Sequence, residues 1–479
     1  MILTVDLGTS ATKVAVWADD GLVGLGRAPV ETRYLPDQRV EQDPATWWAS
    51  VTAAVRALPA DAAGALASVE ALGFSATRQT FVPVAGDGSA LGAALVWSDR
   101  RAGAEAAALA RRCGGGEAAH ERTGLVLDAA APAAKVAWLA DHDPARLDGA
   151  RWLLAPRDLV VLRCTGEVRT DASLASASGL YDTTGDAVGA PVDELVGTAA
   201  GLLPEVVPSA SVVAGLRPGP AADLGVRPGI PVVIGAGDRA CEVLGSGAGP
   251  GRPMVSWGTT ANVSVPVGHR PRPLPAAVVA TCGALGGWLL EGGLSAAGSA
   301  LAWLGRLAGV PVADLMDRAE ASPPGARGAT ALPWFGGARA PWWRDGAGGA
   351  FLGLSLDHDA ADLARALLES VALDLDRCLA VAAAGATGLA LGGAGSASGL
   401  WVRILCAVTG LPALRRRSGE AASAGAALVA AAATGVPIDL ERIDPVAQRA
   451  SPEGDLVAAY GALRAGADAV AAAVLGTAP

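Results

Sequence analysis

Lysine is nearly absent from this chain of 479 residues. The 37 basic residues are arginine except at Lys13 and Lys135, and 47 acidic residues give a formal net charge of −10. An acidic chain of this kind does not favour general binding to nucleic-acid phosphates. The two lysines stand out, because a compact ammonium is a point charge that the planar fork of arginine does not reproduce.

Histidine, closely spaced cysteine and long apolar runs are lacking as well. The four histidines show no HxxxH spacing and the six cysteines form no CxxC, which argues against zinc and predicts buried, reduced thiols. No run of about 18 residues is dense in Leu, Ile, Val and Phe. The first residues, MILTVDLG, lack the basic segment and cleavage site of a secretory signal. We therefore expect a soluble cytoplasmic protein with no membrane or nucleic-acid partner.

The length and the order of patterns predict an α/β protein with two domains. The N-terminal segments ILTVDL, KVAVWAD and LVGLGRA predict a meander of three strands, and PVVIGAGD predicts a buried strand that ends in an acid. A Gly/Pro-rich linker, residues 245–253, precedes a second strand-turn-strand, MVSWGTTANVSVPV. Helices are predicted for AAKVAWLADH, AADLARALLESVALDLDRCLA, SGLWVRILCAVTG, EAASAGAALVAAAATG and residues 455–475.

An internal echo links the two halves. VDLGTSATKVAV opens the first half and VSWGTTANVSV opens the second, which suggests duplication of one α/β domain. Either copy alone could be an ordinary turn. Two such turns facing each other across a cleft would present glycine backbone N–H groups and Thr or Ser hydroxyls to one polyphosphate.

The two copies differ at one informative position, where the first has Asp6 and the second has Ser256. A single carboxylate beside a phosphate suits Mg²⁺, which is usually held through waters, one or two carboxylates and phosphate oxygens. Lys13 follows at the end of the first hairpin as a point charge. The chain has no GxxxxGK[ST] motif, so this is not a P-loop.

Asp238 ends the strand predicted for PVVIGAGD. An acid at the carboxyl end of a buried parallel strand is where α/β enzymes place chemistry. Phosphoryl transfer to an alcohol requires alignment, charge neutralisation and one acid that accepts the hydroxyl proton. Asp238 suits that role, and the alternative is that it caps the helix RACEVLGSG.

Taken together, these segments resemble the FGGY carbohydrate kinases, which include xylulokinase, glycerol kinase and gluconokinase. The resemblance runs from residue 1 to about 435 through DLGTSATK, LVWSDRRA, PAAKVAWLADH, GAGDRACEVLG, WGTTANVSV, EGGLSAAGSALAWL, LPWFGGARAPWWRDGAGGAFLGL, LGGAGSASGLWVRIL and EAASAGAALVAA. It implies two duplicated ribonuclease-H-like domains of the actin and hexokinase type, with ATP in the cleft between them. We expect a sugar-binding domain over 1–246, an ATP-binding domain over 247–440 and a helical tail over 441–479.

The resemblance also implies roles for individual residues. Asp238 matches the catalytic base, and Asp6 with Asp238 matches the Mg²⁺ site. Arg78, Gln79, Asp238 and Arg239 are the implied substrate contacts. The implied ATP contacts are Gly8, Thr9, Ser10, Lys13, Gly258, Thr259, Gly298, Gly393, Ala394 and Ser398.

The sequence predicts the type of reaction more closely than it predicts the acceptor substrate. GFSATRQTFVPV is closer to the Gln-Arg-Glu-Thr of glycerol kinase than to the Gln-Met-His-Gly of xylulokinase, with Gln79 in place of the acid. Arg78 and Arg239 would suit an acceptor rich in oxygen, even a sugar acid. WSDRR, residues 97–101, either supports this pocket or forms a structural Asp–Arg pair.

We predict ATP-dependent phosphorylation of a primary hydroxyl of a small sugar, a pentulose or other ketose. A polyol or a sugar acid is the alternative acceptor. Two other classes of protein stay open, an actin-like or chaperone ATPase and a kinase-like protein that only binds its ligand. The family often forms dimers, so a homodimer is an expectation as well.

Overall fold

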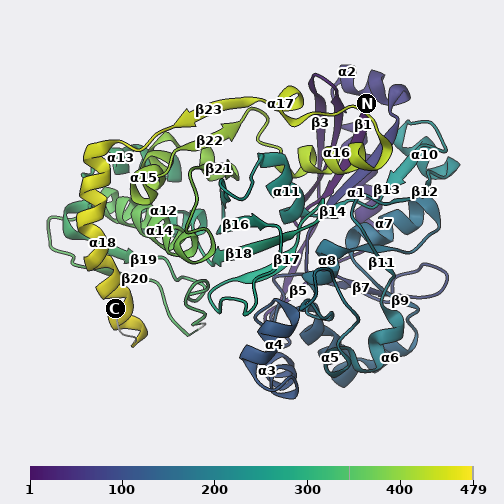
Figure 1. The fold of residues 1–479 in the computed structure, drawn as a ribbon, viewed down its shortest axis with the longest axis horizontal. Coiled ribbons are helices and arrows are strands. Elements are labelled where there is room, and N and C mark those ends of the chain that lie inside the picture. The colour runs from purple at the N-terminus through teal and green to yellow at the C-terminus, as the bar shows by residue number, and fades with distance from the viewer. Residues whose placement is uncertain (345, 477–479) are drawn as a thin grey trace.

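The computed structural model describes residues 1–344 and 346–476, which form two α/β units, each built on a mixed sheet of seven strands (Figure 1). The chain passes from the first sheet to the second between residues 246 and 254. This architecture confirms the predicted fold class and the presence of two units. The last three residues of the tail predicted over 441–479 lie outside the described residues.

The N-terminal sheet begins with the predicted meander. In spatial order it contains β12 (Val212–Gly215), β13 (Pro231–Val233), β6 (Ala71–Ala76), β1 (Ile2–Leu7), β2 (Ala11–Ala18) and β3 (Gly21–Pro29), and β14 (Ala236–Gly237) pairs with β6. Strands β1 to β3 are antiparallel, β6 is parallel to β1, and β13 is parallel to β6. At the edge, β12 pairs with β13 in the antiparallel direction.

The C-terminal sheet repeats this arrangement. In spatial order it contains β17 (Val279–Cys282), β18 (Trp288–Leu294), β16 (Ala261–Val267), β15 (Met254–Trp257), β21 (Leu389–Gly392), β22 (Ala413–Arg416) and β23 (Val446–Ala450). Strands β15, β16 and β18 form an antiparallel meander, while β21 and β22 continue in parallel and β23 closes the edge in the antiparallel direction. The equal topology of the two sheets confirms the duplication that the sequence echo suggests, with β17 added.

Helices cover both faces of the N-terminal sheet. They are α1 (Ala45–Arg56), α7 (Pro156–Thr165) and α10 (Pro218–Leu224) on one face, and α11 (Asp238–Ser246) and α16 (Ala421–Thr434) on the other. Helix α16 comes from the last part of the chain, yet it packs against the first sheet, where Trp17 donates a hydrogen bond to the Ser423 hydroxyl at 2.9 Å. In Figure 1, α11 and α16 lie between the two sheets. These two helices therefore join the halves of the molecule.

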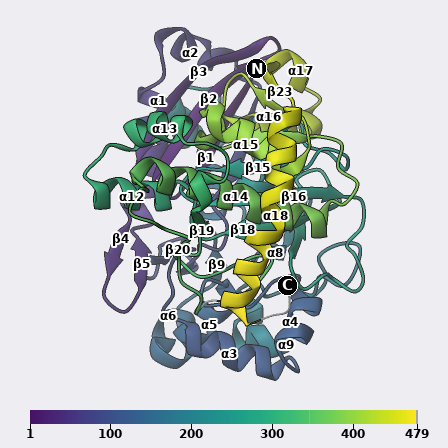
Figure 2. The ribbon, with the colours of Figure 1, turned by 90° about the vertical axis from the view of Figure 1, so that its left-hand side faces the viewer.

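The C-terminal sheet packs against α12 (Gly298–Ala308), α14 (Ala360–Ala382) and α15 (Gly399–Thr409), beside α13 (Val312–Ala321). Helix α18 (Gly454–Leu475) runs along the outside of this unit (Figure 2). Within the described ranges it alone is long and apolar enough to cross a membrane by length and composition, and 17% of that window is buried. Its Asp468 pairs with Arg377 of α14 at 2.5 Å, which joins it to the unit by an ion pair.

A lobe of smaller elements borders the first sheet. Its helices are α3 (Gly103–Arg112), α4 (Gly116–Thr123), α5 (Pro132–His142), α6 (Pro144–Asp148), α8 (Ala172–Ser176) and α9 (Asp193–Val196). Two further short helices are α2 (Ala60–Ala65) and α17 (Leu440–Ile443). A small sheet of three strands contains β4 (Arg33–Leu35), β5 (Arg39–Gln42) and β8 (Ala94–Leu95). Three pairs of strands complete the short elements: β7 (Val82–Val84) with β9 (Trp152–Leu154), β10 (Thr170–Asp171) with β11 (Val206–Val207), and β19 (Thr330–Leu332) with β20 (Ala350–Leu352).

The lobe also touches the second sheet. The backbone N–H of Ala280 in β17 donates to the carbonyl of Gly124 at 2.8 Å, and the Cys282 N–H donates to the Ser176 hydroxyl at 2.9 Å. Together with α11 and α16, these contacts connect the two units on both sides of the cleft. The six cysteines are free and all but Cys113 are buried, as the sequence predicts.

Candidate active site

A cavity of about 290 Å³ lies between the two sheets. It is within reach of the two similar hairpins, β1–β2 in the first unit and β15–β16 in the second. Its walls come from the turn after β1, the loop after β6, the start of α11 and the strands β16, β17 and β18. Its lining includes Thr9, Gln79, Asp128, Asp238, Thr260 and Glu291. Thr9 and Thr260 belong to the two hairpins, so both hairpins face the same cavity, as the sequence echo predicts.

Asp238 is the first residue of α11 and follows directly on β14. Gly237 occupies the N-cap position, so the alternative interpretation of Asp238 as the cap is wrong. The Asp238 side chain is 44% exposed and lies 3.6 Å from the Arg78 guanidinium, and its Oδ1 accepts the Arg239 N–H at 2.7 Å. Desolvation in the cleft raises the pKa of the Asp238 carboxyl, although Arg78 and Arg239 oppose this effect. The carboxylate is therefore presented to the cavity by a rigid helix start.

Asp6 is buried at the end of β1 and accepts a hydrogen bond from the Ser75 hydroxyl at 2.9 Å. Burial raises the pKa of Asp6 to about 6, against the attraction of Lys13, and the negative charges of Asp238 and Glu420 add to the rise. Within residues 1–344 and 346–476, no group of three His, Cys, Asp or Glu side chains could hold a metal ion. Mg²⁺ needs only one or two carboxylates and takes its other ligands from water and phosphate, so the role of Asp6 and Asp238 in holding it stays a prediction.

Lys13 lies across from Asp6 on β2, with Nζ 4.0 Å from the Asp6 carboxylate. The same Nζ donates to Glu420 at 2.8 Å, and Arg27 of β3 also pairs with Glu420. Glu420 immediately precedes α16, so this ion cluster joins the first hairpin to the start of that helix. Lys13 thus has a structural partner beside the expected phosphate end, and its contact with ATP stays a prediction.

The first hairpin turn is closed and hydrogen-bonded to the loop after β6. The Gly8 N–H donates to the Ala11 carbonyl at 3.2 Å, and Ser10 is exposed at the tip. The Thr9 hydroxyl lies 3.3 Å from the Thr77 hydroxyl and accepts a hydrogen bond from the Trp97 indole at 2.9 Å. The hairpin and the loop after β6 therefore hold a fixed position relative to each other.

The predicted nucleotide segments gather around the second hairpin. The Gly298 N–H at the start of α12 donates to the Gly258 carbonyl at 2.8 Å, and Ala297 donates to the Thr259 carbonyl at 3.0 Å. Gly393 has φ of 74°, and a Cβ there would lie 2.4 Å from the Trp257 carbonyl, so only glycine fits this approach. A single 3₁₀ turn, Ala394–Ala397, follows, and the Ser398 hydroxyl caps α15. The structure brings these segments together, and their contact with ATP stays a prediction.

The loop after β6, which carries the predicted substrate contacts, is held in an uncommon backbone conformation. Gln79 has φ of 57°, which non-glycine residues rarely adopt outside functional or strained sites. Lys135, fully buried in α5, donates to the carbonyls of Gln79 at 3.2 Å and Val96 at 2.7 Å. The second surviving lysine therefore supports the predicted substrate loop from beneath.

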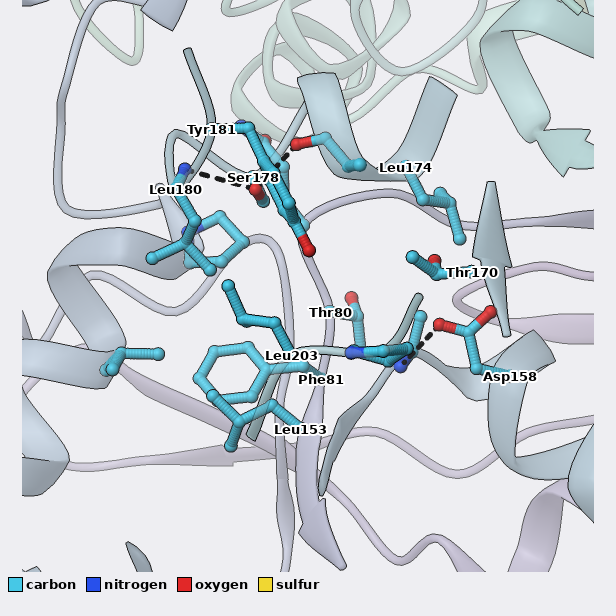
Figure 3. Close-up of a pocket in the computed structure, with 16 residues that line it drawn as sticks. Thr80, Phe81, Leu153, Asp158, Thr170, Leu174, Ser178, Leu180, Tyr181 and Leu203 are labelled. Carbon is cyan, nitrogen blue, oxygen red and sulfur yellow. Dashed lines mark hydrogen bonds between the residues drawn. The ribbon is translucent and has the colours of Figure 1, made fainter. Parts of the chain in front are cut away.

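A second, smaller cavity of about 60 Å³ lies on the other side of this loop, and Gln79 lines both cavities. In Figure 3, Tyr181 points into it, Phe81, Leu153 and Leu203 form an apolar wall, and Asp158 lies opposite beside Thr170. Burial raises the pKa of the Tyr181 phenol, with a smaller contribution from the Asp158 charge. The loop is thus backed by a mainly apolar space on one side and the polar cavity on the other.

Both interpretations of WSDRR hold, each for a different residue. Trp97 lines the cavity. Asp99 is fully buried, where its carboxylate accepts the Val40 N–H at 2.6 Å and pairs with Arg101 at 2.7 Å, which is the structural Asp–Arg pair. Arg100 pairs with Asp128 at 2.6 Å and so orients a carboxylate that lines the cavity.

Sequence reasoning missed several lining residues, among them Asp128, Asn262, Glu291, Arg339 and Trp343. Glu291 lies on β18, inside the segment EGGLSAAGSALAWL, and Arg339 and Trp343 lie in LPWFGGARAPWWRDGAGGAFLGL. Both segments carried the family resemblance without a role assigned to these side chains. A charged residue inside an otherwise apolar strand was the available signal for Glu291.

Comparison with known proteins agrees with this geometry. Residues 1–245 match the N-terminal domain of the FGGY family of carbohydrate kinases, and residues 254–434 match its C-terminal domain. The chain belongs to the FGGY family of carbohydrate kinases. It is a carbohydrate kinase, and kinases of this family use ATP.

Individual relatives differ in the acceptor that they are named for. The chain is 32% identical over 452 residues to a glycerol kinase from Trichlorobacter lovleyi, covering 91% of this chain and 90% of the relative. It is 30% identical over 437 residues to a xylulose kinase from Streptomyces rubiginosus, covering 90% and 87%. A crystal structure of a xylulose kinase from Rhodospirillum rubrum superposes with a TM-score of 0.88 at 26% identity, covering 98% of each chain. These relatives support a small-molecule sugar or polyol substrate.

Proposed function

We propose that this kinase transfers the γ-phosphate of ATP to a primary hydroxyl of a pentulose or another small ketose, with Asp238 as the general base. The observation that carries the proposal is the position of the Asp238 carboxylate. It opens into the cavity that Thr9 and Thr260 of the two hairpins also line. An acceptor hydroxyl beside Asp238 would thus meet the phosphate end of a nucleotide held by both hairpins.

In this mechanism the protein aligns reactants and accepts one proton, because phosphoryl transfer needs little covalent chemistry from its enzyme. Asp238 takes the proton from the acceptor hydroxyl as that oxygen attacks the γ-phosphorus in line. The Gly8 and Gly258 N–H groups close their own turns, so the backbone N–H groups that follow them in each turn would donate to phosphate oxygens. Asp6 and Asp238 would hold Mg²⁺, which supplies charge neutralisation at the phosphates. Closure of the two units over the bound substrates would exclude water from the transfer.

The size and lining of the cavity favour a ketose over a three-carbon polyol. Hydrogen-bonding groups lie around its whole wall, on Gln79 and Asp128 from the first unit and on Asn262 and Thr281 from the second. A pentulose, with four hydroxyls and a ketone, can match more of them than glycerol can. A polyol acceptor is the second candidate, because the loop segment TRQT resembles glycerol kinases and a glycerol kinase is 32% identical.

The test of the base is Asp238→Asn, assayed by ADP release with ATP, Mg²⁺ and a panel of pentuloses, hexuloses and polyols. We expect turnover to fall at least ~10²-fold, the lower end of general-base effects, while ATP binding measured by calorimetry is retained. Asp186→Asn is the control, since its side chain is 82% exposed and does not line the cavity. Near-normal turnover in Asp238→Asn would remove Asp238 from the mechanism. ATP hydrolysis that no sugar or polyol stimulates would favour an ATPase instead.

A further inference from the structure

Arg78, which lies closest to the proposed base, already has a carboxylate in its guanidinium fork. Nη1 and Nη2 of Arg78 donate to the two carboxylate oxygens of Glu291 at 2.7 and 2.8 Å. The Glu291 side chain is 3% exposed and also accepts a hydrogen bond from the Thr281 hydroxyl at 2.5 Å. A bidentate pair of this kind is among the stronger charge-assisted interactions and fixes the plane of the guanidinium.

The charge state of this pair follows from its geometry. Burial alone would raise the pKa of the Glu291 carboxyl, but Arg78 outweighs burial and holds the pKa below its ordinary value. Burial would likewise lower the pKa of Arg78, and Glu291 raises it. Both groups are therefore charged when the cavity is formed, and they face each other from the two units of the protein.

Arg239, the other arginine expected to contact the acceptor, also lies beside carboxylates of the protein. Its Nη1 donates to Glu242 at 2.6 Å, one turn further along α11, and its Nε lies 3.9 Å from Glu291. That Nε has no hydrogen-bond partner among the residues that the structure describes. The indole Nε1 of Trp343, another residue that lines the cavity, is a second buried N–H without a hydrogen-bond partner in that part of the chain.

The charges of the lining residues balance. Among the described residues, three arginines and three carboxylates line the cavity: Arg78, Arg239, Arg339, Asp128, Asp238 and Glu291. The arginines that suggested an acidic acceptor at the level of sequence thus face carboxylates of the protein itself. The fork of Arg78 that a carboxylate would need is therefore already filled by Glu291.

We propose that Glu291 selects uncharged polyhydroxy acceptors, because its carboxylate occupies the fork of Arg78 that the carboxylate of a sugar acid would need. The inference rests on the proposed kinase function and names the substrate class of the same site. An aldonate entering the cavity would meet the negative charge of Glu291 at close range, and like charges across a desolvated contact strongly suppress binding. Glu291 acts through Arg78, so it is a positioning and specificity residue and not a catalytic one.

The test compares two five-carbon acceptors that differ in charge, D-xylulose and D-xylonate, on the wild-type enzyme and on Glu291→Gln. The amide keeps the shape and an oxygen acceptor for Arg78, but it removes the negative charge. We expect wild type to prefer xylulose, and Glu291→Gln to shift the ratio of kcat/KM for xylonate over xylulose upward by at least ~10-fold. Loss of structural support alone would lower both values together and leave the ratio unchanged.

Two further variants keep the outcome decisive. Glu242→Gln releases Arg239 from a less buried pair and should shift the ratio in the same direction, even if Glu291→Gln folds poorly. Glu121→Gln removes another ion pair between the units, to Arg270 at 3.0 Å, outside the cavity, and should leave the ratio within ~2-fold. Calorimetric binding of xylulose and xylonate, without ATP, reads the same selectivity in the absence of turnover.

The possible results separate this inference from the proposed function. Binding that follows the expected selectivity, with no phosphorylation of either compound, would refute the kinase reaction on pentuloses and support the role of Glu291. Turnover of xylulose with an unchanged ratio in both Glu291→Gln and Glu242→Gln would refute the role of Glu291 and leave the kinase function intact. A wild-type enzyme that prefers xylonate would overturn the inference outright.

Discussion

The helix that carries Asp238 is held by backbone contact with α16, and one methyl group should disturb it. A Cβ at Gly425 of α16 would lie 1.9 Å from the carbonyl oxygen of Cys241 in α11. Real Cβ contacts essentially never fall below 3.0 Å, so Gly425→Ala requires a shift of about 1.1 Å between the two helices. The atom in the way is backbone, which cannot rotate aside as a side chain would.

The net effect combines two opposing contributions. Overpacking of a tight contact costs about 1–3 kcal/mol, and a rigid backbone obstacle favours the upper end of that range. Replacing a helical glycine by alanine gains about 1 kcal/mol in propensity. Gly425→Ala should therefore lose about 2 kcal/mol. For a unit of ~245 residues the unfolding entropy is about 0.5 kcal/mol per degree, so the apparent Tm should fall by about 4 °C.

Gly461→Ala is the matched control. Gly461 also lies inside a helix, α18, but nothing stands within 4 Å of the added Cβ. It should gain up to about 1 kcal/mol, and its Tm should rise by about 2 °C. Scanning calorimetry measures both variants, and ADP release should show a large kcat loss only in Gly425→Ala, because a 1 Å displacement at a catalytic group can cost ~10²-fold. Equal Tm values for Gly425→Ala and wild type would refute this account of the α11–α16 contact.

Two further predictions concern the buried groups beneath the cavity. Burial raises the pKa of Asp6 to about 6, from an ordinary value of 3.8. Between these two pH values the folded protein keeps the proton that the unfolded chain has lost. Above pH 6 the ionised carboxylate destabilises the folded protein, by about 3 kcal/mol at most. Asp6→Asn should therefore raise the Tm of the metal-free protein at pH 8 but not at pH 4. In the wild type, the Mg²⁺ affinity measured by calorimetry should fall up to ~10-fold for each pH unit below 6. Lys135→Met removes the donor to the Gln79 carbonyl and should raise the acceptor KM about 10-fold while the KM for ATP stays within ~2-fold; equal changes in both would contradict that role.

The local parts of the site could be predicted from the sequence because their signals are local. The hairpin around Gly8, its echo around Gly258 and the acid at the end of the PVVIGAGD segment each depend on neighbouring residues. The predicted helices also appear, because their apolar spacing does not depend on what covers them. Such features carry their own geometry and need no tertiary information.

Contacts between distant segments could not be predicted in this way. Lys13 and Glu420 are 407 residues apart, and only the packing of α16 on the first sheet brings them to 2.8 Å. Glu291 was missed for a related reason. Strand β18 is buried on nearly all its residues, so it shows no alternation of polar and apolar side chains that would indicate which face lines a cavity.

The registers of the two sheets show where the duplicated halves diverge. Asp6 pairs with Lys13 and Lys13 with Arg27 in the first sheet, and the corresponding pairs in the second sheet join Ser256, Asn262 and Gly293. The first row thus carries one negative and two positive charges, and the second carries none. Glu420 forms ion pairs with both cations of the first row, Lys13 and Arg27. The charged groups that are expected to meet the metal and the phosphates therefore lie in one copy of the hairpin.

The same comparison explains why duplication alone could not reveal the specificity residue. Two residues further along from the pair of Asn262 and Gly293, Ser264 pairs with Glu291. Two residues further along from the pair of Lys13 and Arg27 in the first sheet, Ala15 pairs with Leu25. The equivalent of Glu291 is thus a leucine, which packs against the α11–α16 layer instead of lining the cleft. The hairpin backbones that are expected to hold phosphate are present in both copies, whereas the carboxylate proposed to reject acidic acceptors is present in one. Acceptor selectivity in this fold can therefore change by substitution in the second sheet while the phosphate-binding hairpins stay the same.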